Sequence, residues 1–221
     1  MLDDIDVRAI KTGMLFDAAT TRAVARTLRA HCAPPHPPPP LVVDPVCVST
    51  SGHTLLHPDA LAVLLAELFP LAALVTPNKP EAELLLSHSQ VREPGTPGAQ
   101  VQIASLEDMR DAAVRLGALG PRAVLLKGGH VELTFADVEQ FANANQGVEV
   151  VREGFLGENM EILQVNEADM GSRPVVVDLL WEKERMALFV NPRVDSTSTH
   201  GTGCTLSAAI ASLLGKGESG M

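Results

Sequence analysis

The sequence has few cysteines and no long apolar run. Its three cysteines, Cys32, Cys47 and Cys204, are an odd number at wide spacing. This pattern excludes a disulfide scaffold and predicts reduced thiols in an intracellular compartment. No apolar stretch reaches the length of a membrane span, and the opening residues 1–6 lack the basic and apolar regions of a signal peptide. We therefore expect a soluble, cytoplasmic protein without a membrane partner.

Positive charge is also scarce. The chain carries 17 lysines and arginines against 27 aspartates and glutamates, which gives a formal net charge of −10 at pH 7. This balance argues against a general nucleic-acid-binding surface, because such surfaces need an excess of basic residues. An acidic protein can still bind nucleotides through Mg²⁺ and local dipoles. The expected partner is therefore a small molecule and no nucleic acid.

The residues that are present fit a single α/β domain. The 221 residues, 46% of them hydrophobic, are enough to bury a sizeable core, and no internal repeat or second domain is evident. Strand-like and helix-like segments alternate, which is typical of a largely parallel central sheet flanked by helices. Strands are expected at residues 7–11, 41–44, 74–76, 123–127 and 175–180, with 186–190 as a hairpin partner. Helices are expected at residues 17–30, 58–68, 80–86 and 105–119, and from the turn at residue 201 to residue 214.

Two segments are expected to lie at the surface. Residues 31–40 are so rich in proline that they can form neither helix nor strand, which predicts a stiff loop. Residues 141–174 are rich in glycine, asparagine, glutamate and glutamine, which predicts a long surface insertion. Neither segment is expected to carry the chemistry.

Two glycines flank Thr202 at the start of the last expected helix, and Cys204 follows them. Gly201 and Gly203 let the backbone turn its N–H groups toward one point, and the helix adds the positive end of its dipole there. The pattern predicts a site for a negative group, and the same environment favours the thiolate form of Cys204. The alternative is a plain glycine turn before a core helix, with Cys204 as a small buried side chain.

Polar side chains stand where several expected strands end, at Asp44, Thr76 and Lys127. In open α/β sheets ligands bind beyond the carboxyl ends of the strands, so these residues are expected to face one crevice. Asn78 and Glu81, at the start of a helix, can hold hydrated Mg²⁺ or cap that helix, and the two roles are compatible. The alternative for Asp44 is a turn-forming aspartate, and for Lys127 a solvated lysine before a glycine turn.

Six short motifs follow one another along the chain: Ala9-Ile10-Lys11-Thr12-Gly13-Met14, Asp44-Pro45-Val46, Ser51-Gly52, Thr76-Pro77-Asn78 with Glu81, Lys127-Gly128-Gly129-His130, and residues 199–206. In this order they resemble the hydroxymethylpyrimidine and phosphomethylpyrimidine kinases of thiamine biosynthesis, within the ribokinase-like superfamily. The resemblance covers most of the chain. It implies a ribokinase-like layered α/β fold that is incomplete at both ends, because relatives carry further strands before the Lys11 motif and further helices after the last one here. Residues 1–221 would then form a single partial kinase domain.

The resemblance also implies an activity and roles for individual residues. ATP would phosphorylate 4-amino-5-hydroxymethyl-2-methylpyrimidine and then its monophosphate. Cys204 would act as the base, and Gly201, Thr202 and Gly203 would supply N–H groups to the transferring phosphoryl group. The residues expected to bind ATP are Asn78, Lys127 and Thr205, those expected to organise Mg²⁺ are Asp44 and Glu81, and Met14 is expected to face the pyrimidine.

Other functions fit parts of the same pattern. A pyridoxal or pyridoxamine kinase of the same superfamily is one alternative, although the Asp44 and Lys127 motifs suit the pyrimidine branch better. A non-catalytic remnant that acts as a binding module is a second alternative. A thiol enzyme with Cys204 as nucleophile is a third, but no histidine is clearly placed as its base. Relatives are often dimers, so a homodimer is expected.

Overall fold

A mixed β-sheet forms the centre of the computed structural model, which describes residues 5–31, 38–48, 55–89, 101–152, 171–183, 185–194 and 201–217. Its strands follow the order β1-β2-β3-β4-β7-β8-β6, and β5 pairs with β7 outside this path. The fold class is therefore α/β, as the alternation of segments predicts. The sheet divides into a parallel half and a largely antiparallel half.

The parallel half consists of β1 (Ile10–Thr12), β2 (Leu41–Val43), β3 (Leu74–Val75) and β4 (Ala123–Leu126). These strands are shorter than predicted, and residues 7–9 lie outside β1. All residues of β2, β3 and β4 are buried, as expected for parallel strands with helices on both faces. Because the four strands run in the same direction, their carboxyl ends meet at one edge of the sheet.

The antiparallel half differs from the prediction of a largely parallel sheet. β7 (Pro174–Glu182) pairs antiparallel with both β4 and β8 (Arg185–Pro192), so the expected hairpin forms. β6 (Val148–Arg152) runs parallel to β8, and β5 (Leu133–Thr134) lies antiparallel to β7. The prediction that residues 141–174 are entirely a surface insertion is therefore wrong for β6, which contributes its backbone to the sheet. Residues 153–170 lie outside the described part of the chain.

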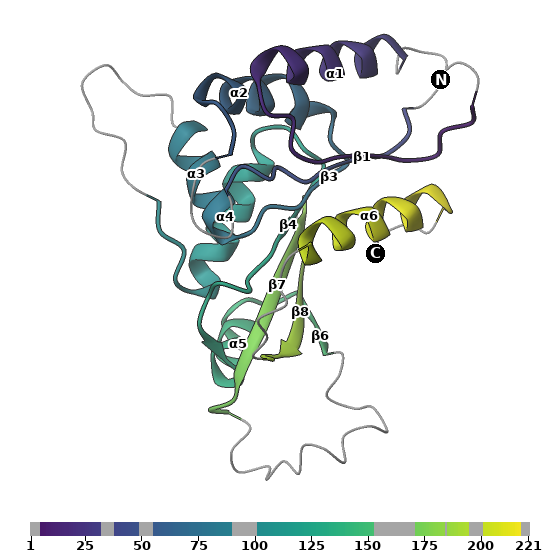
Figure 1. Cartoon of the computed structure of the whole chain (residues 1–221). Helices are drawn as coiled ribbons and strands as arrows, with labels where there is room; N and C mark the ends of the chain where they lie inside the picture. Colours follow the sequence, from purple (N-terminus) through teal and green to yellow (C-terminus); the bar gives the residue numbers. More distant parts are fainter. Residues whose placement is uncertain are drawn as a thin grey trace.

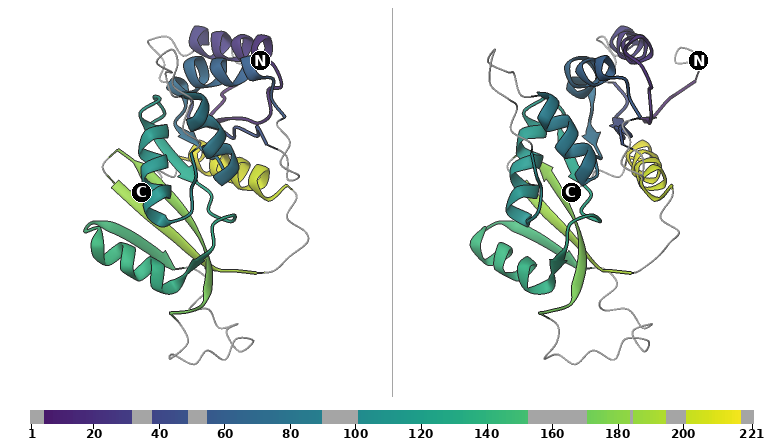
Figure 2. Two further views of the ribbon diagram at one scale, coloured as in Figure 1. Left: turned by 90° about the vertical axis from the view of Figure 1, so that its left-hand side faces the viewer. Right: turned by 60° about the vertical axis from the view of Figure 1, so that its left-hand side comes forward.

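Helices cover the two faces of the sheet unequally (Figures 1 and 2). One face carries α1 (Ala18–His31), α2 (Pro58–Val63), α3 (Lys79–Ser89), α4 (Leu106–Gly117) and α5 (Phe135–Ala144). α2 continues into the π-helical turn η1 (Leu64–Leu68) and the 3₁₀ turn η2 (Phe69–Leu71). The other face carries α6 (Thr202–Gly215), which lies against β1 and β2. Capping boxes begin α4 at Ser105 and Asp108, and α5 at Thr134 and Asp137.

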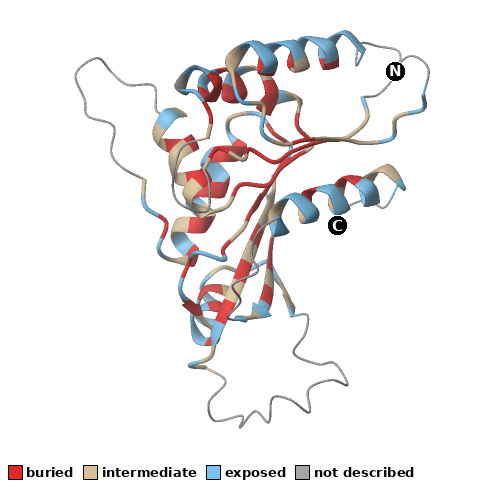
Figure 3. Ribbon diagram, viewed as in Figure 1, coloured by how far each residue is buried: buried red, intermediate tan, exposed pale blue. Residues whose placement is uncertain are grey.

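The buried residues form two apolar clusters of unequal size. Figure 3 shows buried residues along the central strands and on the helices that cover them. The larger cluster lies between the sheet and α1 to α5, and the smaller one lies under α6, around Val42, Leu74 and Leu125. Alternation along the strands sends neighbouring residues to opposite clusters, for example Val42 to the smaller and Val43 to the larger. The residues two positions after Val42, Leu74 and Leu125 lie on the same side of their strands and therefore face α6. No helix in the described ranges is long and apolar enough to cross a membrane.

Candidate active site

The carboxyl ends of the parallel strands and the first turn of α6 enclose a pocket of about 640 Å³. Asp44 follows β2, Asn78 follows β3, and Lys127 follows β4, so three strand ends each contribute one polar side chain. Glu81 of α3 and the turn of residues 201–204 complete the polar lining. The prediction that polar residues at strand ends face one crevice is confirmed for Asp44 and Lys127, and for Asn78 in the turn after Thr76. Thr76 itself is fully buried and does not line the pocket.

Asp44 is the centre of a buried polar network beside this pocket. Its carboxylate is 2% exposed and accepts hydrogen bonds from the hydroxyls of Thr76 at 3.3 Å and Ser207 at 3.1 Å. The ammonium groups of Lys127 and Lys11 lie 3.4 and 3.9 Å from its two oxygens. A buried carboxylate is stable only when it is paired and hydrogen-bonded in this way. Asp44 therefore connects β1, β3, β4 and α6 through these contacts, and it does more than form a turn.

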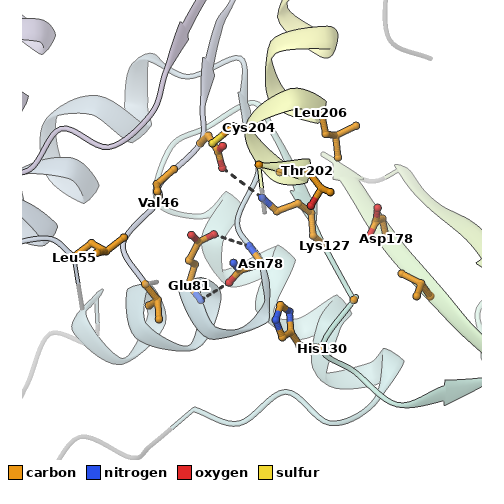
Figure 4. A pocket seen from close by; sticks show the side chains of 16 residues that line it. Val46, Leu55, Asn78, Glu81, Lys127, His130, Asp178, Thr202, Cys204 and Leu206 are labelled. Atoms are coloured by element: carbon orange, nitrogen blue, oxygen red, sulfur yellow. Dashed lines mark hydrogen bonds and ion pairs between the residues drawn. The ribbon is translucent and has the colours of Figure 1, made fainter. Parts of the chain in front are cut away.

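Asn78 and Glu81 cap the start of α3 and line the pocket at the same time (Figure 4). The Glu81 carboxylate accepts from the Asn78 backbone N–H at 2.8 Å, and the Asn78 side-chain oxygen accepts from the Glu81 N–H at 2.9 Å. This reciprocal pair is a capping box, so the capping role is confirmed. Glu81 is 3% exposed, and its burial raises the pKa of its carboxyl above the usual value, against the opposing effect of the Asn78 N–H and the Lys127 charge.

The burial of Glu81 predicts a pH-dependent stability. Because the pKa of the Glu81 carboxyl is raised in the folded state, the folded chain binds the carboxyl proton more tightly than the unfolded chain does. The stability that this protonation contributes is lost as the pH rises from the ordinary pKa of 4.5 through the folded pKa. Glu81→Gln lacks this titration. Its free energy of unfolding, measured by urea denaturation between pH 4.5 and 8, is expected to improve relative to wild type as the pH rises.

The matched control for this prediction is Glu139→Gln, at an exposed position of α5. The difference in unfolding free energy between this variant and wild type is expected to stay constant over the same pH range. A constant difference for Glu81→Gln as well would contradict the prediction.

The first turn of α6 is the segment where the sequence predicts an anion site. Gly201 is the N-cap residue of α6. Its φ of 79° and ψ of −7° lie in the left-handed region that glycine adopts without strain, and glycine has no side chain to cap the helix. The first N–H groups of a helix have no acceptor within the helix and point out of its end. At Gly203 a Cβ atom would lie 2.9 Å from Nζ of Lys127, so glycine leaves room for the ammonium group there.

Cys204 is exposed and lines the pocket, so the alternative of a small buried cysteine is wrong. Cys47 shows the contrasting case, because it is fully buried, and burial together with the negative charge of Glu81 raises the pKa of its thiol to about 12. Cys47 therefore stays protonated. Of the two cysteines in the described ranges, Cys204 is the one that a ligand in the pocket can reach.

Three features of the lining were assigned no role from the sequence, although His130 and Val46 belong to motifs named there. Asp178, in the middle of β7, accepts a hydrogen bond from the Gly128 N–H at 2.9 Å, and burial raises the pKa of its carboxyl. His130 also lines the pocket, and so does Val46, whose φ of 35° is rare for a β-branched residue. Asp178 had a weak signal, since it interrupts an otherwise apolar strand. The conformation of Val46 had none.

Two predicted site residues lie outside the lining formed by the described residues. Met14 is 50% exposed and does not line the pocket. The Thr205 hydroxyl donates to the Gly201 carbonyl at 3.0 Å, within its own helical turn. Ser51-Gly52 and residues 199–200 of the predicted motifs lie outside the described residues. Within the described ranges no three histidine, cysteine, aspartate or glutamate residues form a cluster that could hold a metal ion by themselves.

The sequence profile of the phosphomethylpyrimidine kinase family matches residues 1–161 and 159–220. The chain belongs to this family. A bifunctional thiamine biosynthesis protein of Geobacter sulfurreducens is 36% identical over 218 residues, which are 99% of the chain and 33% of the relative. A hydroxymethylpyrimidine/phosphomethylpyrimidine kinase of Rhizobium meliloti is 34% identical over 217 residues, which are 98% of the chain and 60% of the relative.

Solved structures of kinases share the fold. A phosphomethylpyrimidine kinase of Clostridium difficile aligns with a TM-score of 0.63 and 28% identity, over 99% of this chain and 64% of that one. An ADP complex of Bacillus subtilis pyridoxal kinase aligns with a TM-score of 0.64 and 26% identity, over 98% of this chain and 60% of that one. The chain therefore has the ribokinase-like α/β fold of these kinases. The chain spans between one third and two thirds of the length of these relatives.

Proposed function

We propose that the chain transfers the γ-phosphoryl group of ATP to the 5-hydroxymethyl group of 4-amino-5-hydroxymethyl-2-methylpyrimidine, and a second one to the resulting monophosphate. The observation that supports this most is the convergence of three parts in one pocket: the exposed Cys204 thiol, the glycine turn of α6, and the Lys127 ammonium group. The curated relatives that carry this function resemble the chain over nearly its whole length.

Each part has a role in that reaction. Cys204 takes the proton of the hydroxymethyl group, whose oxygen forms the new bond to phosphorus as the bond to the leaving ADP oxygen breaks. The N–H groups of Gly201, Thr202 and Gly203 face the transferring group, and Lys127 faces the nucleotide phosphates. Phosphoryl transfer has a loose transition state, so positioning and charge stabilisation count for more than the strength of the base. Met14 and Thr205 are proposed to contact the pyrimidine and the nucleotide, respectively.

The residues present fit hydrated Mg²⁺. Magnesium in kinases is held by one or two carboxylates together with water and substrate phosphates, so a cage of three protein ligands is not required. Glu81 presents a buried carboxylate to the pocket, and Asp44 presents a second one, already surrounded by hydrogen-bond donors. We propose that Glu81 and Asp44 hold the ion largely through water, with Asn78 beside them. The ion supplies positive charge that neutralises the phosphate oxygens.

The experiment that tests this function is ATP consumption in the presence of Mg²⁺, with and without the hydroxymethylpyrimidine. It is made on this chain and on a version extended at both ends to the length of the Rhizobium meliloti relative. Turnover that depends on the pyrimidine in either version supports the proposal. If neither version turns over, the kinase proposal is rejected and the binding-module alternative is favoured.

Replacing Cys204 by alanine is expected to lower kcat about 100-fold, because a positioned base contributes roughly 10²- to 10⁴-fold and the loose transition state places this case at the low end. KM for ATP is expected to stay within about threefold, as for a group that acts mainly in the transition state. The measurement is steady-state kinetics. Ser212→Ala, at an exposed position of the same helix, serves as the control. An unchanged kcat for Cys204→Ala would reject its role as the base.

A pyridoxal or pyridoxamine kinase is the second candidate. It is favoured by the likeness to the Bacillus subtilis pyridoxal kinase, whose TM-score of 0.64 is close to the 0.63 of the phosphomethylpyrimidine kinase. Competition between pyridoxal and the hydroxymethylpyrimidine for turnover separates the two, because the better substrate has the higher kcat/KM. We further propose a homodimer, which light scattering of the purified chain tests.

A further inference from the structure

Asp178 lies at an unusual place for a carboxylate, in the middle of a strand and inside the sheet. It is opposite Phe189 in the pairing of β7 with β8, and Val176 and Leu180 share its side of the strand. That side faces α6 and the pocket, which Val176 and Asp178 both line. In the view of Figure 4, Asp178 lies on one side of Lys127, while Asn78 and Glu81 lie on the other. Asp178 is partly buried, and a carboxylate withdrawn from water costs free energy unless it is paired, so its partners indicate its purpose.

We propose that Asp178 is a positioning residue for the phosphate end of the site. Its carboxylate holds the segment from Lys127 to His130, here called the glycine loop, against β7 through the N–H of Gly128. The effect on turnover rests on the proposed kinase function, whereas the hydrogen bond between Asp178 and Gly128 does not.

The backbone of the glycine loop is connected to the segment after β3 and to β7. The Lys127 N–H donates to the Pro77 carbonyl at 2.9 Å, which ties the start of the loop to the end of β3, and the Val131 N–H donates to the Gly128 carbonyl at 2.8 Å. The connection to β7 is at Gly128, where the N–H donates to Oδ1 of Asp178 at 2.9 Å. Gly128 also lies directly against the Val177 carbonyl, which leaves no room for a side chain.

The residues on either side of this connection form the pocket wall. Lys127 precedes Gly128, and Gly129 and His130 follow it, and all three line the pocket. A shift of Gly128 away from β7 therefore moves a cation and an imidazole that face the same cavity. Displacements of about 1 Å in such groups are enough to lower turnover about 100-fold.

The hydrogen-bond acceptor of Asp178 matters more than its charge. The Lys127 ammonium group already has the Asp44 carboxylate 3.4 Å away, so a second negative charge is not needed to hold it. An amide at position 178 also presents a carbonyl oxygen that can accept the Gly128 N–H. We therefore expect asparagine to replace Asp178 and an apolar side chain to fail.

The test compares Asp178→Asn with Asp178→Val, because valine is β-branched and suited to a strand but has no acceptor. Glu182→Gln is the matched control, because Glu182 lies on the same strand and the same side but not in the pocket lining. Two quantities are measured: the hydrogen-exchange rate of the Gly128 amide by NMR, and the kinetic constants for ATP. Emission of the single tryptophan, Trp181 on β7, reports whether each variant is folded.

In Asp178→Val the Gly128 amide is expected to exchange at least about 10-fold faster, and kcat/KM for ATP is expected to fall about 10- to 100-fold, as for the loss of a hydrogen bond to a charged group. In Asp178→Asn both quantities are expected to stay within about threefold of wild type, as for Glu182→Gln. Unchanged Gly128 exchange in folded Asp178→Val would overturn the proposal. So would equal losses of kcat/KM in the valine and asparagine variants, because the charge would then be the essential property.

The exchange measurement keeps the proposal separate from the proposed function. If the wild-type chain consumes no ATP with any pyrimidine, the kinase function fails, while faster Gly128 exchange in Asp178→Val still supports the positioning role. If Asp178→Val does not fold, the exchange rate in Asp178→Asn decides. A rate within threefold of wild type supports the proposal, and a rate more than about 10-fold faster overturns it.

Discussion

Replacing Asp44 by alanine is expected to lower the free energy of unfolding by about 3 kcal/mol, because removal of one partner leaves the buried charges of the others uncompensated. The Asp44 carboxylate accepts hydrogen bonds from the hydroxyls of Thr76 and Ser207. It also lies within 4 Å of the ammonium groups of Lys11 and Lys127. The two lysine side chains are 23% and 15% exposed, so solvent compensates only part of the loss. Urea denaturation at pH 7 measures the effect.

Two further variants test the origin of that loss. Asp44→Asn keeps an acceptor for the hydroxyls but removes the charge, so its stability is expected to lie between those of wild type and Asp44→Ala. Asp111→Ala removes an aspartate that is 65% exposed and paired with Arg110, and it is expected to change the unfolding free energy by less than about 1 kcal/mol. A stability of Asp44→Ala equal to that of Asp111→Ala would contradict the prediction.

Replacing Gly128 by alanine is expected to destabilise the fold by about 3 kcal/mol, at the upper end for an overpacked site. A Cβ atom at this position would overlap the carbonyl oxygen of Val177 and lie 3.0 Å from the methyl group of Met109. The clash is with the backbone of a central strand, which has less freedom than a side chain. To relieve it the loop must move away from β7, and the hydrogen bond from Gly128 to Asp178 is then lost.

The neighbouring glycine provides the control for this prediction. A Cβ atom at Gly129 would meet nothing within 4 Å, and the backbone there does not have a positive φ. Gly129→Ala is therefore expected to leave the melting temperature within about 2 °C of wild type, as for an unstrained surface substitution. Equal melting temperatures of the two variants would show that β7 yields to the added methyl group.

Several parts of the fold were predictable because their signals are local. The glycine turn at residue 201 and the apolar stretch after it predict α6, and Asn78 with Glu81 predicts the capping box of α3. The helix α5 was missed, although Thr134 and Asp137 carry the same type of signal. The strand β6 was missed because it is only five residues long, carries one acidic and one basic side chain, and lies inside a polar stretch, so its alternation is too short to be distinctive.

The candidate site divides in the same way. The order of the motifs and the polar residues at the strand ends identify Asp44, Asn78, Lys127 and Cys204 from the sequence, since each lies within a short, characteristic run. Asp178 was not identifiable, because its role depends on a hydrogen bond to a residue 50 positions away. A pattern within one strand contains no information on which loop crosses it.

The sequence by itself determined the class of the fold, the family, and the residue types at the carboxyl ends of the parallel strands, because these follow from short motifs and from hydrophobic periodicity. Only the tertiary structure decided which of these residues are buried and paired. Asp44 and Ser207 are 163 positions apart and meet because α6 packs across β1 and β2. Burial raises the pKa of the Glu81 carboxyl. This shift, the position of Lys127 and the exposure of Cys204 depend on contacts between distant segments that only the folded chain brings together.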